Sequence, residues 1–87
     1  MNVKFAARAW DHYLYWAKTD RKTFNRLNKL IESARRTPFS GIGKPEALRG
    51  NLSGFWSRRI DRKHRLVYRV VGDTLEIAAC RFHYGKS

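Results

Sequence analysis

The last third of the chain, from Asn51 to Tyr84, constrains the fold more than any other stretch. It reads NLSGFWSRRIDRKHRLVYRVVGDTLEIAACRFHY, in which three runs rich in β-branched and aromatic residues are separated by two polar turns. This pattern is typical of a three-stranded antiparallel meander. The predicted strands are Gly54–Ile60, Arg65–Val71 and Thr74–Tyr84.

The turn Gly72-Asp73 predicts the register between the second and third of these strands. A two-residue hairpin loop needs a residue with positive φ, which glycine adopts without strain. The pairs that follow on one apolar face are Val70 with Leu75, Tyr68 with Ile77 and Leu66 with Ala79. The residues of the opposite face are Arg65, Val67 and Arg69, facing Cys80, Ala78 and Glu76. Arg69 and Glu76 should form a cross-strand ion pair. We expect the apolar face to pack a core and the arginine-bearing face to be the working surface.

The same alternation leaves the direction of His83 open. Strict alternation places His83 on the face of Ile77 and Ala79, away from Arg65. Either a β-bulge precedes Phe82–Tyr84, or the strand ends and bends there.

The upstream half predicts two short helices that form a hairpin on the sheet. The first is expected over Ala6–Lys18, with an apolar stripe made of Trp10, Tyr13, Leu14 and Ala17. Thr19-Asp20 interrupts this helix and offers an N-cap for the next. The stripe of the second helix is made of Phe24, Leu27, Leu30, Ile31 and Ala34. Pro38 disfavours helix at Thr37 and ends the element. With Asn2–Phe5 as a candidate edge strand, the 87 residues predict a single α+β domain.

The charge balance favours an anionic partner. Nineteen Lys and Arg against seven Asp and Glu give a net charge of +12, which attracts nucleic acid, an anionic membrane surface or an acidic protein. A membrane role is the weakest of these, because no apolar run approaches ~18 residues and the basic residues are not confined to one amphipathic helix. No secretory signal is visible, and the single cysteine, Cys80, suits a reducing cytoplasm.

Two residues are candidates for acid–base chemistry. Glu46 lies between Lys44 and Arg49 in a predicted loop over residues 37–50, which is long for so small a domain. It is either a solvated carboxylate or a general base that its basic neighbours keep ionised. His83 is either a structural histidine at a strand end or a general acid, since imidazole can hold and release a proton near neutrality.

Cations crowd the meander and alternate with aromatic residues. The cations are Arg58, Arg59, Arg62, Lys63, Arg65, Arg69 and Arg81, and the rings are Trp56, Tyr68, Phe82 and Tyr84. Such a surface is typical of a single-stranded nucleic-acid platform, where cations hold phosphates and rings stack bases.

A carboxylate, an imidazole and an arginine around a phosphodiester also meet the needs of RNA transesterification. One group removes the 2′-hydroxyl proton, another protonates the departing 5′-oxygen, and a cation stabilises the phosphorane. His64, which lies beside Arg65, competes with His83 for the acid role. No Cys and His pairs occur at metal-ligand spacing, so we expect neither a metal site nor a cofactor.

A resemblance to a known family covers nearly the whole chain. The chain closely resembles the YoeB/Txe family of toxins from type II toxin–antitoxin modules in the stretches RRTPFSGIGKPEALRGNLSGFWSRRI, HRLVYRV and IAACRFHY, and in WDHYLYW at Trp10–Trp16. That family belongs to the RelE-like superfamily of ribosome-dependent mRNA interferases. The resemblance implies a compact RelE-like fold, with two helices against a twisted, mainly antiparallel sheet.

The resemblance also implies a role for each matching residue. It implies that Glu46 is the general base, His83 the general acid, Arg65 the stabiliser of the transition state and Tyr84 a group that binds or orients the RNA. The residues that would contact substrate or rRNA are Lys44, Arg49 and Arg59. The implied reaction is metal-independent cleavage of mRNA in the ribosomal A site, leaving a 2′,3′-cyclic phosphate (or 3′-phosphate) and a 5′-hydroxyl.

The implied partners are the ribosome with its mRNA and a cognate YefM/Axe-type (Phd/YefM-like) antitoxin, with operator DNA contacted only through the antitoxin complex. A homodimer is a further candidate assembly. Two other interpretations stay open: a basic module that binds RNA or DNA without cutting it, and a structural or regulatory protein whose partner is an acidic chain. Cleavage assays with ribosomes discriminate between them and the toxin.

Overall fold

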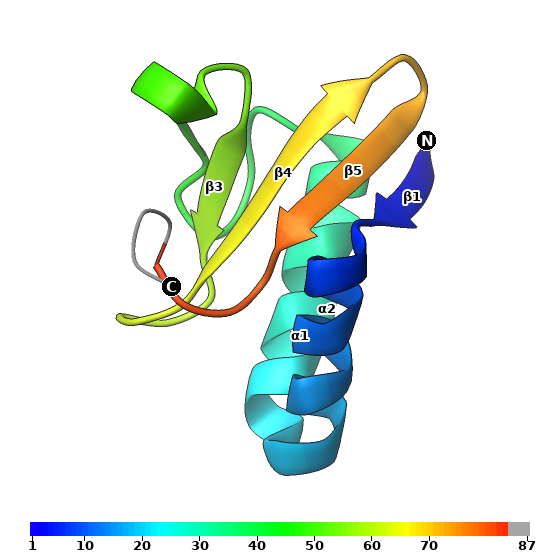
Figure 1. The fold of residues 1–87 in the computed structure, drawn as a ribbon, viewed down its shortest axis with the longest axis vertical. Helices are drawn as coiled ribbons and strands as arrows, with labels where there is room; N and C mark the ends of the chain where they lie inside the picture. The colour runs from blue at the N-terminus through cyan, green and yellow to red at the C-terminus, as the bar shows by residue number, and fades with distance from the viewer. Residues whose placement is uncertain (84–87) are drawn as a thin grey trace.

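A computed structural model describes residues 1–83 and shows two α-helices packed on a five-stranded sheet (Figure 1). The helices are α1 (Ala7–Thr19), α2 (Arg21–Arg36) and the short 3-10 helix η1 (Gly50–Leu52). The strands are β1 (Asn2–Phe5), β2 (Glu46–Ala47), β3 (Trp56–Arg59), β4 (Arg65–Val71) and β5 (Thr74–Ala79). Their order is β1-β5-β4-β3-β2, with β1 parallel to β5 and the other neighbours antiparallel. The predicted α+β class and mainly antiparallel sheet are confirmed.

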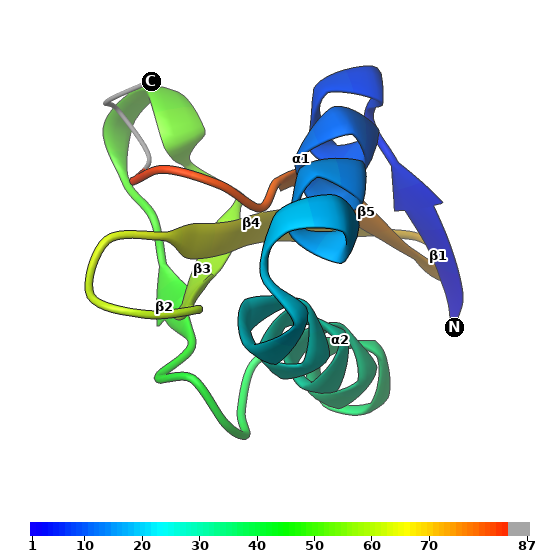
Figure 2. The same ribbon diagram turned by 90° about the horizontal axis from the view of Figure 1, so that it is seen from below.

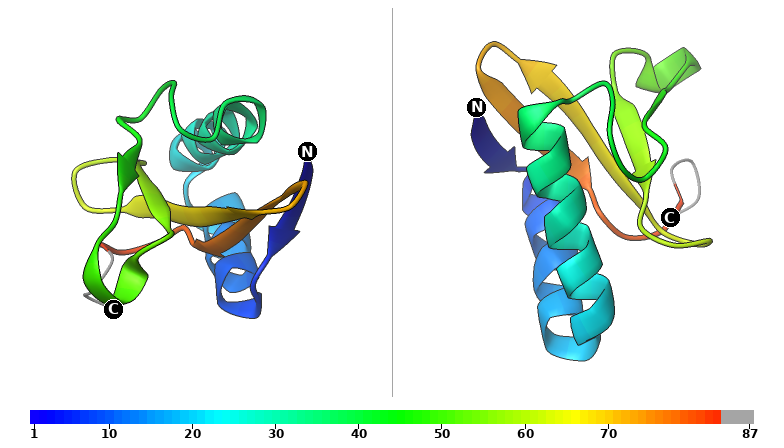
Figure 3. Two further views of the ribbon diagram at one scale, coloured as in Figure 1. Left: turned by 90° about the horizontal axis from the view of Figure 1, so that it is seen from above. Right: turned by 180° about the vertical axis from the view of Figure 1, so that it is seen from behind.

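The helices leave part of one sheet face uncovered. In Figure 1, α2 lies behind the sheet, and α1 runs beside α2 with its first turns against the end of β5. The view from behind in Figure 3 has α2 in the foreground. On the other side of the sheet, η1 and the segment that follows β5 lie next to the uncovered part of β3 and β4 (Figure 2).

The helices confirm the predicted boundaries within a few residues, but the buried face of α1 is different. Asp20 caps α2 by accepting hydrogen bonds from the backbone N–H and the hydroxyl of Thr23, at 3.1 and 2.8 Å. The buried residues of α2 are Leu27, Leu30 and Ala34, as predicted, and those of α1 are Ala9, His12 and Trp16. The predicted α1 stripe was wrong for Trp10, which is 45% exposed and contacts the rings of Phe5 and Tyr13, whereas Tyr13 does pack against the core.

The hairpin register is confirmed near the turn and wrong beyond it. Val70 pairs with Leu75, and Tyr68 pairs with Ile77. The next pair is Val67 with Ala79, rather than Leu66 with Ala79, because a β-bulge leaves Ala78 as an extra residue in β5. The bulge turns Cys80 away from the face of Arg65 and into the core, where its side chain is fully buried. The strand also ends at Ala79 instead of Tyr84, and Phe82 has a positive φ of 69°. Both alternatives for the approach to His83 are therefore realised.

A buried arginine fixes the long loop to the sheet. Arg58 is fully buried between the loop and the core, so its assignment to an exposed cationic platform was wrong. Its guanidinium donates to the hydroxyls of Tyr68 and Ser33 and to the carbonyls of Thr37, Ser40 and Ile42, at 2.7–3.0 Å. In strand geometry residues 56, 58 and 60 share one face, which is the covered face here.

The path of the same loop is fixed by close contacts at Gly43. Gly43 has a φ of 82°, and a side chain at this position would meet Leu30 at 2.6 Å. Its carbonyl accepts from the backbone N–H of Arg59 at 2.7 Å. The loop then forms the two-residue strand β2, which corrects the prediction of continuous loop over residues 37–50. Glu46 is consequently an edge-strand residue rather than a loop residue.

Candidate active site

Glu46 lies at one end of a row of side chains that crosses the uncovered sheet face. The row follows from the register, because Glu46 pairs with Ser57, Ser57 with Val67, and Val67 with Ala79. Paired residues of neighbouring strands project from the same face of a sheet. The core residues of β4 occupy the other face, so this row defines what we call the outer face. Glu46 itself is exposed.

The next rung of the outer face holds two arginines. Arg59 of β3 pairs with Arg65 of β4, two residues along from Ser57 and Val67. The Arg65 guanidinium donates from Nη1 to the carbonyls of Asp61 and His64, at 2.7 and 3.1 Å. Those bonds hold the half-buried Arg65 close to the start of β4, whereas Arg59 is exposed.

His83 reaches the outer face from the segment that follows β5. It lines a pocket of about 130 Å³ together with Val67, Ala79 and Arg8 of α1. The backbone of this segment is bonded to the start of β4, since the N–H of Arg65 donates to the carbonyl of Phe82 at 3.0 Å. Tyr84, the fourth predicted catalytic residue, lies outside the described residues 1–83.

The other predicted RNA contacts surround Glu46. Arg49 lines the same depression as Glu46 and immediately precedes η1. Lys44 is exposed and has a positive φ of 54°, which turns the chain into β2. The register therefore places Glu46, Arg59 and Arg65 on the outer face, and Arg49 shares a depression with Glu46. His83 lines a pocket with Val67 and Ala79 of the same face.

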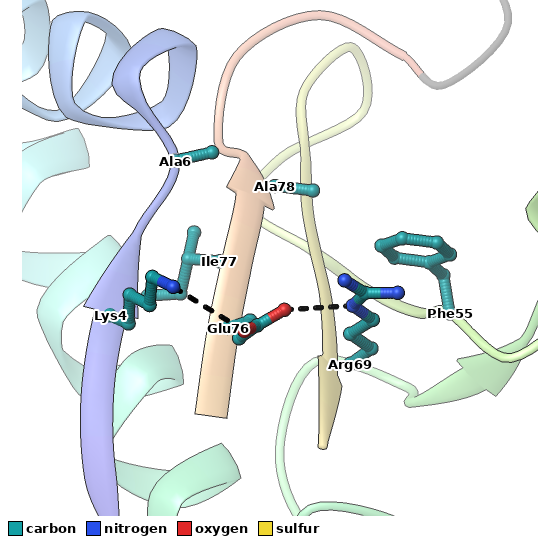
Figure 4. A pocket seen from close by; sticks show the side chains of 7 residues that line it. All are labelled: Lys4, Ala6, Phe55, Arg69, Glu76, Ile77 and Ala78. Atoms are coloured by element: carbon teal, nitrogen blue, oxygen red, sulfur yellow. Dashed lines mark hydrogen bonds and ion pairs between the residues drawn. The ribbon is translucent and has the colours of Figure 1, made fainter. Parts of the chain in front are cut away.

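The far half of the outer face is occupied by an ion-pair network (Figure 4). Glu76 of β5 contacts Arg69 of β4 at 2.8 Å and Lys4 of β1 at 3.8 Å, which confirms the predicted Arg69–Glu76 pair. The Arg69 guanidinium also lies 5.1 Å from the centre of the Phe55 ring. Glu76 is therefore a carboxylate already neutralised by cations, whereas Glu46, at the opposite edge of the sheet, has no ion pair among residues 1–83.

Two histidines hold the segment that follows β5: His12, which the sequence patterns did not single out, and His64, which was named only as a candidate acid. His12 and His64 accept backbone hydrogen bonds through Nδ1 from Cys80 and Phe82, at 3.2 and 2.7 Å. Burial lowers the pKa of both imidazoles below the usual value. The spacing of His12 between Ala9 and Trp16 was the available signal, because residues three and four apart share a helix face. Burial also raises the pKa of the Cys80 thiol to about 12.

Within residues 1–83, no group of three or more His, Cys, Asp or Glu side chains is arranged to hold a metal ion. No helix in that range is long and apolar enough to cross a membrane. The polar groups that the outer face does offer are a carboxylate, arginines and an imidazole, the set that phosphodiester cleavage uses as base, charge stabiliser and acid.

Comparison with known proteins identifies the family of the chain. The sequence model of the YoeB-like toxins of bacterial type II toxin–antitoxin systems matches residues 5–84. Toxin YoeB of Escherichia coli strain K12 is 57% identical over 84 residues, which are 97% of this chain and 100% of the relative. A solved YoeB/ParE toxin from Agrobacterium tumefaciens superposes with a TM-score of 0.94 at 49% identity, covering 97% of this chain and 100% of that one.

A complex is known for a further relative. The heterotetrameric YoeB–YefM toxin–antitoxin complex from Staphylococcus aureus contains a chain with a TM-score of 0.88 and 42% identity, covering 97% of this chain and 98% of that one. A YoeB from the same organism is also solved as a dimer.

The fold and the outer face define a RelE-like toxin, with two helices on a mixed sheet and a cationic face beside a carboxylate and an imidazole. The chain belongs to the family of YoeB-like toxins of bacterial type II toxin–antitoxin systems. That membership implies a nuclease-type toxin.

Proposed function

We propose that this toxin is a ribosome-dependent endoribonuclease that enters the ribosomal A site and cleaves mRNA by metal-independent acid–base transesterification. The observation that carries the proposal is the row from Glu46 to Ala79, which supports a carboxylate and an imidazole acting from two flanks of one face. Inhibition of translation follows from the loss of intact message.

The spacing of the strands supports this chemistry. Glu46 lies in β2 and Val67, which lines the pocket of His83, lies in β4. Two strand spacings amount to roughly 10 Å, which leaves room for a phosphodiester between the two side chains. In-line attack needs a base and an acid on opposite sides of the phosphorus, so this separation suits Glu46 as base and His83 as acid.

Arginines would stabilise the charge that develops on the phosphorane. Arg65 is the candidate for that role, because carbonyl contacts preorganise its guanidinium on the outer face. Lys44, Arg49 and Arg59 would bind mRNA or rRNA phosphates, and Tyr84 would help to orient the RNA.

The products provide the direct test. We expect purified toxin with programmed ribosomes to cut mRNA in the A site and leave a 5′-hydroxyl on one fragment and a 2′,3′-cyclic phosphate (or 3′-phosphate) on the other. Primer extension locates the cut, and labelling by polynucleotide kinase without prior phosphatase treatment detects the 5′-hydroxyl. Fragments that carry a 5′-phosphate would contradict transesterification. The absence of cleavage on ribosomes would instead favour a non-catalytic module that binds RNA or DNA.

A YefM-like antitoxin is the proposed partner, and the S. aureus complex supports this choice. The net charge of +12 calls for an acidic partner surface, because complementary charge both neutralises the toxin and speeds association. We propose that the complex forms in the cytoplasm, contacts operator DNA only through the antitoxin, and includes a toxin homodimer as a further assembly, as in the S. aureus dimer.

Hydrogen exchange can locate the antitoxin. We expect the bound antitoxin to slow amide exchange at the start of β4, around Arg65, and in the segment that leads to His83, because acidic and apolar residues would cover the outer face. Protection confined to the outward sides of α1 and α2, with Arg65 unchanged, would place the antitoxin elsewhere and refute this proposal.

A further inference from the structure

The segment that carries His83 is held by a clip of two backbone hydrogen bonds. The N–H of Phe82 donates to Nδ1 of His64 at 2.7 Å, and the carbonyl of Phe82 accepts from the N–H of Arg65 at 3.0 Å. Both partners lie at the start of β4, although Phe82 is 18 residues further along the chain than His64. Since His83 follows Phe82 directly, the clip fixes the backbone from which His83 projects.

A second pair of hydrogen bonds holds the same segment two residues earlier, at Cys80. The N–H of Cys80 donates to Nδ1 of His12 at 3.2 Å, and the carbonyl of Cys80 accepts from Nε1–H of Trp16 at 2.8 Å. Both side chains come from the buried face of α1. The segment has left the sheet after Ala79, so side chains replace the ladder that strand pairing would otherwise supply.

An imidazole can form the clip in only one protonation state. A nitrogen that accepts a hydrogen bond carries its lone pair and no proton, so His64 must be neutral with its proton on Nε2. Protonation of Nδ1 would bring two N–H groups face to face and break the bond. The His64 ring is also packed between the rings of Trp16 and Phe82, with centres 4.8 and 6.0 Å away.

We propose that His64 is a positioning residue, whose neutral imidazole holds the Phe82 amide and thereby fixes His83 at the outer face, so that protonation of His64 releases the segment from Cys80 to His83. This inference rests on the proposed function, because it assigns His83 the acid role. It gives His64 a task other than proton transfer to the RNA.

The charges around both histidines favour the neutral state at physiological pH. Burial lowers the pKa of His64 below its usual value, and the cations that add to this effect are Lys63, Arg65 and Arg81, while Asp61 opposes it. Burial likewise lowers the pKa of His12, where the neighbouring cations are Arg8 and Arg81, Asp11 opposes them and His64 adds a small lowering effect. Cations therefore face the clip from α1, from β4 and from the held segment itself.

The sign of the pH effect follows from linkage. Because the pKa of His64 is lower in the folded chain than in the unfolded chain, the unfolded chain takes up the proton first as the pH falls. The contribution of neutral His64 to the stability of the folded chain is complete above the ordinary pKa of about 6.5 and decreases below it. The clip should open in that same acidic range.

The experiment compares three variants of the full chain by amide exchange, followed by NMR. His64→Leu removes the acceptor, while His64→Asn keeps one, because the asparagine Oδ1 occupies the position of Nδ1 and does not titrate. Arg62→Gln changes an exposed residue of the same turn and is the matched control. We expect Phe82 to exchange roughly tenfold faster in His64→Leu, the loss of one hydrogen bond, and to stay protected in the other two.

The pH dependence and the cleavage rate complete the test. In wild type the protection factor of Phe82 should fall below pH 6.5, and in His64→Asn it should not. Single-turnover cleavage with saturating toxin should be slower in His64→Leu and restored in His64→Asn, and the toxin concentration that gives half the maximal rate should be unchanged in both. The proposed clip would be refuted if the protection factor of Phe82 were unchanged in His64→Leu, or if it did not depend on pH in the wild-type chain. Equal cleavage by His64→Leu and wild type would overturn its positioning role.

The exchange measurement separates this inference from the proposed function. It needs neither ribosomes nor RNA, so exchange of the Phe82 amide tests the clip independently of cleavage. A wild-type chain that protects Phe82 as described and yet cleaves no mRNA on ribosomes would refute the proposed function and with it the assignment of His83.

Discussion

Replacing Glu46 or His83 by glutamine is expected to slow mRNA cleavage on programmed ribosomes by roughly 10²–10⁴-fold, the usual worth of a general base or acid. Arg65→Ala should cost a comparable amount through lost charge stabilisation. Ribosome binding should change far less than the rate, because Glu46 adds no favourable charge toward an anionic substrate. Single-turnover cleavage with excess toxin measures the rate, and sedimentation with ribosomes measures binding.

The outer face offers a matched control for Glu46. Glu76→Gln removes the other carboxylate of the same face, which Lys4 and Arg69 already neutralise, and it should cleave at close to the wild-type rate. Normal cleavage by Glu46→Gln would make this carboxylate a surface residue, and base catalysis would have to come from another group. Normal cleavage by His83→Gln would remove its assignment as the acid.

Replacing Arg58 by methionine should destabilise the domain by about 4 kcal/mol or more. The variant removes the donor from three loop carbonyls and two hydroxyls, at one buried and four part-buried hydrogen bonds, and each buried group left unsatisfied costs about 1–3 kcal/mol. Losses above ~4 kcal/mol are exceptional for single substitutions and indicate a buried network. Arg58→Lys should recover little of the loss, because an ammonium lacks the planar fork of five donors.

The same substitution at the neighbouring Arg59 separates the effect of losing a buried hydrogen-bond network from the effect of losing one positive charge. Arg59→Met makes the same substitution on the exposed face and should change stability by no more than about 0.5 kcal/mol. Urea denaturation followed by tryptophan fluorescence measures both variants. If Arg58→Met and Arg59→Met had the same midpoint, water would have to replace the guanidinium at the loop carbonyls, and the loop would not depend on Arg58.

Local signals predicted the fold wherever one residue type determines the geometry. Gly72-Asp73 defines the hairpin, so the pairs of Tyr68 and Val70 were predicted correctly. Asp20 and Pro38 likewise define the start and end of α2. The bulge at Ala78 had no such signal, because alanine fits either a regular or a bulged strand, and the single extra residue reversed the faces of everything that follows.

The roles of buried polar residues depended on contacts that a sequence pattern does not display. Arg58 was predicted on the exposed platform, although it shares a strand face with Trp56 and Ile60, because its partners are loop carbonyls supplied by the tertiary structure. The same is true of His64, whose partner Phe82 is brought to it by the path of the last segment. The roles of Glu46 and His83 stay predictions until cleavage is measured.

The parallel pairing of β1 with β5 also determines when the sheet can first be completed. Asn2–Phe5 is made at the beginning of synthesis, but its partners are Thr74–Ile77, so the sheet stays open until the ribosome has added the last strand. Pairing between such distant parts of a chain slows folding, since the loop must close before any contact rewards it. The edge of β5 therefore stays without its β1 neighbour until both ends of the chain have been made, and the sheet can be completed only at the end of synthesis.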